Sequence, residues 1–182
     1  MYHQGLLILA PSDTPNIFAF DADTGQTVWS DDQLADVRYV LGVAGSNLIV
    51  GGNRLRAIDI RSGKTRFEWP ESENAGIRGM GRGVLAGDEI FWPTRSEIYV
   101  IHAMTGARTR PPIDLAKVSD CGANLAAANK RLIVAGPDKL MAFGAALPQA
   151  PEQSGERKAI AQMPVPADRV TSNDSVKLNP EP

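Results

Sequence analysis

The chain has 182 residues, a formal net charge of −2 and 43% apolar residues, a composition typical of an ordinary soluble globular protein. No run approaches the roughly 18 apolar residues of a membrane span, and the near-neutral charge argues against a nucleic-acid partner held by bulk electrostatics. The single cysteine, Cys121, excludes an internal disulfide and leaves the redox compartment open.

The first predicted element is a strand within residues 1–11. This segment has an apolar centre but neither a basic flank nor a small-residue cleavage site, so we expect a strand and no signal peptide. The next strand ends at Asp21 and leads through Gly25 into a more polar strand that carries Trp29. Asp side chains hydrogen-bond the local backbone in turns and glycine accepts a positive φ, so a β-hairpin is predicted. We expect no innermost strand of this first blade before Gly5.

The same phrase, a strand that ends in Asp or His followed by Thr or Ser and Gly, returns at residues 55–63 and 98–106. The three glycines are 38 and 43 residues apart, and a degraded fourth copy covers residues 140–144. We take as structural repeat residues Asp21, Gly25, Trp29, Asp59, Gly63, Trp69, His102 and Gly106. A period of about 40 residues filled with short strands is typical of a propeller blade.

A second landmark precedes each of the later copies, at residues 41–51, 83–93 and 125–136. Each consists of small residues, a polar turn and a bulkier apolar strand, and small residues suit an innermost strand near a central axis. Together the landmarks give four strands in the second and third copies, whereas the fourth lacks its outermost strand. The sequence therefore predicts an all-β partial β-propeller of about four four-stranded antiparallel blades, with the first and last incomplete.

We place the propeller repeats in residues 1–144, with blades at approximately 1–34, 35–75, 76–116 and 117–144. The remaining residues, 145–182, contain no aromatic residue and carry six of the thirteen prolines. Such a segment buries too little apolar surface to offset the entropy lost on ordering, so we predict a disordered Pro-rich tail.

Four blades leave two apolar faces uncovered, because propeller blades stack on one another. Complete propellers hold about 4–8 blades. We favour the C-terminal part of a longer propeller, whose missing blades pack on these faces. The alternative is a homodimer in which two copies complete one ring.

Residues 17–29 resemble the repeat of the pyrroloquinoline-quinone-type β-propellers, in which an aromatic or aliphatic pair and Ala-Leu-Asp precede Thr-Gly, with Trp four residues later. The resemblance covers residues 5–144 and weakens along the chain. Phe67 takes the Trp position in the second copy, and Arg110 takes it in the third. The superfamily includes the quinoprotein dehydrogenases and the BamB-like proteins, which have the fold but no cofactor.

The resemblance implies a non-catalytic BamB-like scaffold for protein–protein interaction, with a protein or peptide partner, no cofactor and a place in the periplasm or bacterial cell envelope. The alternative is a fragment of a dehydrogenase, dependent on pyrroloquinoline quinone with calcium, that has lost its cofactor-binding half. Those enzymes use an aspartate beside calcium, a Trp under the quinone and commonly adjacent cysteines. Cys121 has no neighbouring cysteine and the repeats account for Trp29 and Trp69, so we favour a protein that is not an enzyme, without catalytic, cofactor or metal residues.

One candidate binding site remains, an axial anion site at Arg78 and Arg82. Both lie in a glycine-rich stretch at the start of a predicted innermost strand, where guanidinium groups that reach a central channel would hold a carboxylate or phosphate. The alternative, which we favour, pairs both arginines with carboxylates of neighbouring blades.

Three weaker patterns have a structural explanation. Asp21 and Asp23 imitate the start of a calcium loop, but its remaining ligands are missing, so we expect a turn. The glycines of residues 81–86 match a relaxed dinucleotide motif without the helix that motif requires. We expect Cys121 to be a small buried apolar residue.

Overall fold

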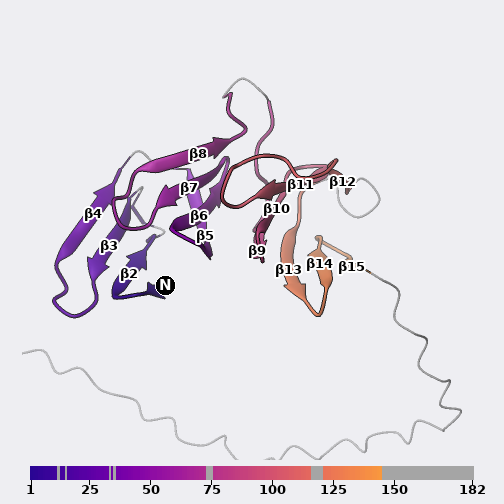
Figure 1. Cartoon of the computed structure of the whole chain (residues 1–182). Coiled ribbons are helices and arrows are strands. Elements are labelled where there is room, and N and C mark those ends of the chain that lie inside the picture. Colours follow the sequence, from indigo (N-terminus) through magenta and orange to yellow (C-terminus); the bar gives the residue numbers. More distant parts are fainter. Residues whose placement is uncertain are drawn as a thin grey trace, which may run out of the picture. The chain divides into compact units, whose positions relative to one another are not determined.

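The computed structural model describes residues 1–11, 13–14, 16–32, 34, 36–72, 76–115 and 121–144. Its strands form four antiparallel sheets, each built from strands that are consecutive in the chain (Figure 1). Helices are absent from these residues, so none of them forms a helix able to cross a membrane. The prediction of an all-β partial propeller is confirmed. The predicted tail, residues 145–182, lies outside the described residues.

Each sheet is a meander in which neighbouring strands are joined by short turns. The first sheet contains β1 (Tyr2–His3), β2 (Leu6–Leu9), β3 (Ile17–Asp21) and β4 (Thr27–Asp31). The second contains β5 (Val37–Ala44), β6 (Asn47–Gly52), β7 (Leu55–Asp59) and β8 (Thr65–Trp69). The third contains β9 (Val84–Ala86), β10 (Glu89–Pro93), β11 (Glu97–His102) and β12 (Ile113–Asp114). The fourth contains β13 (Asn124–Ala128), β14 (Arg131–Ala135) and β15 (Leu140–Phe143), with no fourth strand among the described residues.

The sequence predicts that the first blade lacks its innermost strand. The structure has this strand, β1, but it contains only two residues. Tyr2 pairs with Leu7 and His3 pairs with Leu6. The intervening Gln4 and Gly5 have φ angles of +43° and +83°, and two successive positive φ angles are what a tight two-residue hairpin requires. The expectation that no strand precedes residue 5 is therefore wrong.

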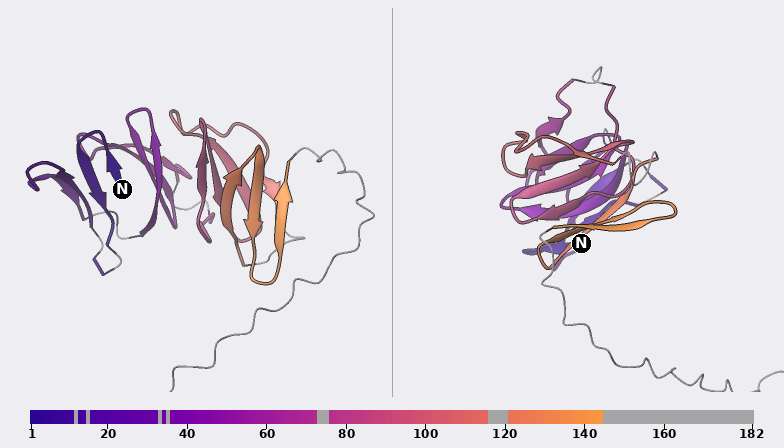
Figure 2. Two further views of the ribbon diagram at one scale, coloured as in Figure 1. Left: turned by 90° about the horizontal axis from the view of Figure 1, so that it is seen from below. Right: turned by 90° about the vertical axis from the view of Figure 1, so that its right-hand side faces the viewer.

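A hydrophobic cluster lies between each pair of successive sheets, which follow one another in chain order in the left view of Figure 2. Strand β6 is buried at all six residues because the second sheet has a neighbour on both faces. Strand β2 instead alternates between buried and exposed residues, since the first sheet has a neighbour on one face only. No core cluster of described residues joins the fourth sheet to the first.

Candidate functional site

The repeated turns use their acidic residues for structure. The Oδ1 atom of Asp21 accepts hydrogen bonds from the backbone N–H groups of Asp23 and Thr24 and from the Thr24 hydroxyl. Asp59 accepts the same set from Arg61 and Ser62 in the second blade. The Thr24 backbone N–H and hydroxyl lower the pKa of Asp21. The geometry is that of a self-capped turn, and no group of three or more metal-ligating side chains occurs among the described residues.

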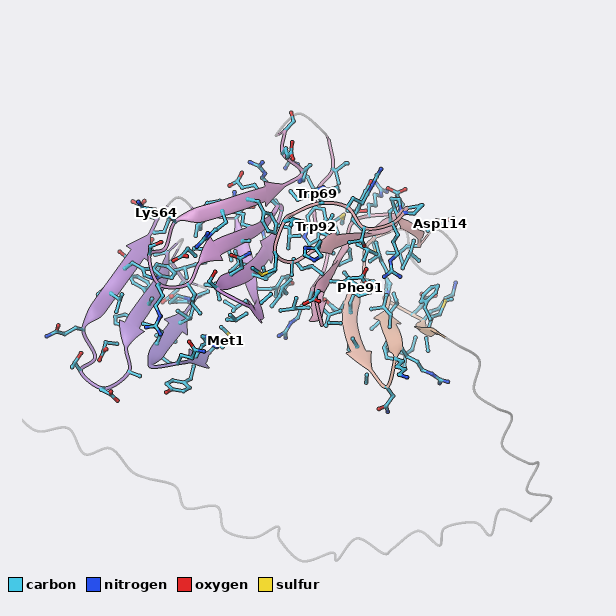
Figure 3. The ribbon with its side chains drawn as sticks, viewed as in Figure 1. Met1, Lys64, Trp69, Phe91, Trp92 and Asp114 are labelled. Carbon is cyan, nitrogen blue, oxygen red and sulfur yellow. The ribbon has the colours of Figure 1, made fainter. Side chains whose placement is uncertain are left out.

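Tryptophans pack the blades together. The indole Nε1–H of Trp29 donates to the carbonyl of Ile60 at 2.9 Å, which ties the outer strand of the first blade to the turn of the second. Trp69 meets Trp92 edge to face (Figure 3), with ring centroids 5.4 Å apart. The ring centroid of Trp69 also lies 4.5 Å from that of Tyr99. The described tryptophans thus take part in contacts between neighbouring blades.

His102 replaces Asp in the third turn and keeps part of its hydrogen bonding. Its Nδ1 lies 3.2 Å from the hydroxyl of Thr105, and its carbonyl accepts from the N–H of Gly106. No helix follows the glycines at residues 81–86, which lead directly into strand β9.

The most strongly charged cluster lies on the second blade, and sequence reasoning missed it. Arg56 on β7 has only 7% of its surface exposed and pairs with both Asp36 and Glu68. Arg54 pairs with Glu68 at 2.6 Å and donates from Nη2 to the carbonyl of Pro70 at 2.7 Å. Burial alone would lower the pKa of Arg56, but the hydrogen bonds that it donates to its two carboxylate partners outweigh burial and raise this pKa. These charges therefore hold two guanidinium groups in fixed positions.

These arginines line a cleft of about 410 Å³. Its lining residues are Asp36, Asn53, Arg54, Arg56, Pro70, Ser72, Ile77 and Arg78. Among the described lining residues, Asp36 is the one carboxylate beside three guanidinium groups, and Asp36 and Glu68 already pair with two of these. The exposed Arg78 is therefore the guanidinium best placed to meet an anionic group.

The two arginines of the predicted axial anion site have different surroundings in the structure. Arg78 is exposed and lines the cleft on the second blade, whereas Arg82 is absent from that lining. The backbone N–H of Arg82 donates to the Oδ1 atom of Asn124 at 2.8 Å, which anchors the chain before β9 to the start of the fourth sheet. Arg78 thus lies at the cleft and Arg82 at a junction between blades, and a shared axial anion site stays a prediction.

A smaller hollow of about 290 Å³ adjoins the cleft and shares Asn53 with it. Arg38, Tyr39 and Cys121 contribute to its lining. Cys121 is exposed there, so the expectation of a buried cysteine is wrong. It lies three residues before the start of β13.

A larger hollow of about 500 Å³ lies between the third and fourth sheets. Arg110 occupies the position that Trp29 holds in the first repeat, and it pairs with Glu89 while its guanidinium lies 5.9 Å from the ring of Phe91. This hollow marks the point where the repeat has lost its aromatic residue, so we attribute it to imperfect packing between blades.

Comparisons with known proteins agree with this architecture. The family described as outer membrane protein assembly factor BamB matches residues 1–146. The structure of BamB from Moraxella catarrhalis is similar at 19% identity, with a TM-score of 0.58, over 77% of this chain and 43% of that one. The computationally designed Ika4 protein is similar at 12% identity, with a TM-score of 0.63, over 80% of this chain and 88% of that one.

An enzyme shares the fold as well. Quinohemoprotein alcohol dehydrogenase from Comamonas testosteroni is similar at 17% identity, with a TM-score of 0.52, over 71% of this chain and 27% of that one. The chain spans less than half of the length of BamB from Moraxella catarrhalis. No curated protein sequence matches the chain. Similarities at this level of identity establish the fold alone.

Proposed function

Because the chain belongs to the family of outer membrane protein assembly factor BamB, we propose that it is a non-catalytic β-propeller scaffold that binds a protein or peptide partner. The cleft on the second blade is the observation that carries the proposal. It combines two arginines held in place by carboxylates with the exposed Arg78 beside them. Guanidinium groups recognise carboxylates through paired hydrogen bonds, so the cleft favours an acidic segment of the partner.

Arg56 and Arg78 differ in burial within the cleft, and this difference supports the proposal. Arg56 is almost fully buried and its charge is compensated by Asp36 and Glu68, so it fixes the shape of the cleft. Arg78 is exposed and follows Ile77, another lining residue. An incoming carboxylate would therefore meet Arg78 without dismantling the ion pairs beneath it.

Fluorescence anisotropy with a labelled hexaglutamate peptide tests the proposal on the full 182-residue chain. We expect saturable binding that weakens as salt is raised, because ions screen exposed charges. Arg78→Ala should weaken binding roughly tenfold, the effect of losing one charge-assisted hydrogen bond. Arg66→Ala is the matched control, since Arg66 is an exposed arginine of the same blade that pairs with Asp59 outside the cleft.

Two results would contradict the cleft as the binding site. One is equal binding of hexaglutamate by the parent and Arg78→Ala proteins. The other is equal loss in Arg78→Ala and Arg66→Ala, which would indicate a general charge effect. Arg82→Ala should leave hexaglutamate affinity unchanged, because Arg82 is not part of the cleft lining.

The family also gives a setting for the scaffold. Its description names outer membrane protein assembly, which supports our proposal that this chain acts in the bacterial cell envelope. Fractionation of cells that express the gene from its own locus tests this, with recovery in the periplasmic or membrane fraction as the expected result. Recovery in the cytoplasmic fraction alone would contradict it.

The second candidate function is a fragment of a quinoprotein dehydrogenase, which the shared fold with the Comamonas enzyme favours. Pyrroloquinoline quinone and calcium added to the purified chain test whether it retains a cofactor site. A scaffold leaves the quinone absorbance band unchanged, whereas saturable binding with a shifted band would replace the scaffold proposal with the dehydrogenase one.

A further inference from the structure

The first sheet exposes positions that are buried in the sheets after it. By strand register, Leu7 and Leu9 on β2 are equivalent to Leu48 and Val50 on β6. Leu48 and Val50 have no exposed surface and pack against the first sheet, whereas Leu7 and Leu9 are 38% and 41% exposed. The first sheet therefore carries a face built for a preceding blade.

Aromatic side chains extend this face. Phe20 is equivalent to Ile58 in the second sheet and to Ile101 in the third, both of which are fully buried. Phe18 stacks on Phe20 with ring centroids 5.8 Å apart. We name Leu7, Leu9, Phe18 and Phe20 the leading face.

The fourth sheet presents the opposite kind of face. Ile133 and Ala142 pair across β14 and β15 and are equivalent to Ile49 and Ala57, which are fully buried against the third sheet. Ala142 is exposed and Ile133 is half-buried. We name Ile133 and Ala142 the trailing face.

The existing interfaces already show how the two kinds of face fit. Between the first and second sheets, Leu48 and Ile58 pack with Ile8 and Ala19 in one cluster. Leu48 and Ile58 are the leading positions of the second sheet, and Ile8 and Ala19 are the trailing positions of the first. One large apolar set thus packs on a smaller set that contains alanine. The uncovered leading and trailing faces of this chain repeat that pairing.

The turns at the edges of these faces carry opposite charges. In the existing interface, Arg61 in the turn of the second blade donates from Nη2 to the carbonyl of Gln4 in the first at 3.3 Å. The equivalent residue on the leading side is Asp23, and the equivalent turn on the trailing side contains Lys130. A leading face placed on a trailing face would therefore bring an aspartate beside a lysine, which favours the contact.

From this equivalence we propose that a second copy of the chain covers both faces, the leading face of each copy packing on the trailing face of the other. Two copies supply eight sheets, within the range of about 4–8 blades found in closed propellers. Each copy has one leading face and one trailing face, so a symmetric pair buries all four faces. The inference does not depend on the anion cleft.

Sedimentation equilibrium of the 182-residue chain tests the proposal, with a mass of twice 19.5 kDa as the expected result. Leu7→Asp and Ile133→Asp should each give monomers, because each puts a carboxylate into both interfaces of the pair. Thr65→Asp is the control, an equivalent charge on an exposed position of a blade that has neighbours on both faces. It should remain dimeric. Circular dichroism checks that each variant keeps its sheets.

Mixing the two monomeric variants distinguishes this arrangement from others. A Leu7→Asp chain paired with an Ile133→Asp chain keeps one interface free of substitutions, so the mixture should regain a heterodimer at about 100 µM. Contact between two leading faces would instead leave Ile133→Asp dimeric and would overturn the proposal. A monomeric parent chain, as expected if other blades cover both faces, would overturn it too.

A covalent test avoids any substitution in the apolar faces. Asp23→Cys and Lys130→Cys, combined with Cys121→Ser, should form a reducible dimer under mild oxidation, since each new thiol meets its counterpart on the other copy. The two single-cysteine versions should remain largely uncoupled. Failure of the double variant to crosslink more than the single ones would contradict the predicted contact between turns.

Discussion

The indole of Trp29 lies on the turn of the next blade at Gly63, where an added Cβ would come within 2.8 Å of the ring. Phe67 and Gly106 repeat this relationship one blade later, with an approach of 2.7 Å. The glycine of each turn is thus required twice, once for its positive φ and once for the aromatic residue that covers it. The repeated phrase is a device for joining successive blades.

Replacing Gly63 by alanine should destabilise the protein by about 2–5 kcal/mol. The left-handed backbone conformation accounts for about 1–2 kcal/mol, and the displacement of the Trp29 ring adds about 1–3 kcal/mol of overpacking. Gly25→Ala is the matched control, because Gly25 has a similar φ of +71° but nothing within 4 Å of the added Cβ. Urea unfolding should show a clearly smaller loss for the control. Equal losses would mean that the aromatic contact adds nothing.

At each of the first two interfaces between blades, a backbone carbonyl in the turn of the later blade accepts a side-chain hydrogen bond, but the donor differs. Trp29 donates to the carbonyl of Ile60, and the equivalent carbonyl of Ala103 accepts from Asn47 at 3.0 Å, because Phe67 has no N–H to offer. The residue equivalent to Asn47 in the first blade is Leu6, which cannot donate. Each interface therefore needs one donor, supplied either by the outer strand or by β6.

Asn47→Leu should consequently destabilise the protein by about 1–3 kcal/mol, the penalty for leaving the buried carbonyl of Ala103 without its donor. Adding Phe67→Trp should recover part of this loss, since the new indole N–H would donate to the carbonyl of Ala103 as Trp29 donates to that of Ile60. Chemical denaturation of the single and double variants measures the coupling. A double variant no more stable than Asn47→Leu would contradict the exchange of donors. Phe67→Trp alone gives the effect of the larger ring.

The period and turn chemistry were sufficient to predict the blades. Each strand that ends in Asp or His lies where the repeated phrase places it, because the turn is specified by residues adjacent in sequence. Strand β1 escaped prediction because Gln4 is an unusual residue for a positive φ. A tight turn is hard to predict from sequence when a residue other than Gly, Asn or Asp adopts the positive φ.

The charged cluster on the second blade could be predicted only in part. Arg56 interrupts an apolar strand, and hairpin register places it opposite Glu68, which is a readable cross-strand pair. Asp36 lies outside that hairpin and reaches Arg56 only through the folded blade. Sequence alone therefore offered no way to see the cleft that forms around the two arginines.

Removing Arg56 should destabilise the protein by about 3 kcal/mol, because Asp36 would lose its guanidinium partner and Glu68 would keep only Arg54. Arg56→Met keeps much of the side-chain volume, so the loss reports on charge. Arg66→Met is the control, since Arg66 is 52% exposed in its pair with Asp59 and exposed pairs contribute at most about 1 kcal/mol. Thermal unfolding at pH 7 should separate the two variants clearly. Similar losses would contradict a structural role for the buried pair.

Tyr99 gives a pH-dependent test of the aromatic cluster between the second and third blades. Burial, followed by the hydrogen bond from its hydroxyl to Glu97 at 2.6 Å, raises the pKa of Tyr99 to about 12. A pKa raised above the unfolded value of about 10 contributes stability that is complete below pH 10 and is lost as pH rises toward 12. The phenolate absorbance of the parent minus that of Tyr99→Phe should therefore appear with a midpoint near pH 12, and Glu97→Gln should lower that midpoint. A difference signal centred near pH 10 in the folded protein would contradict this packing.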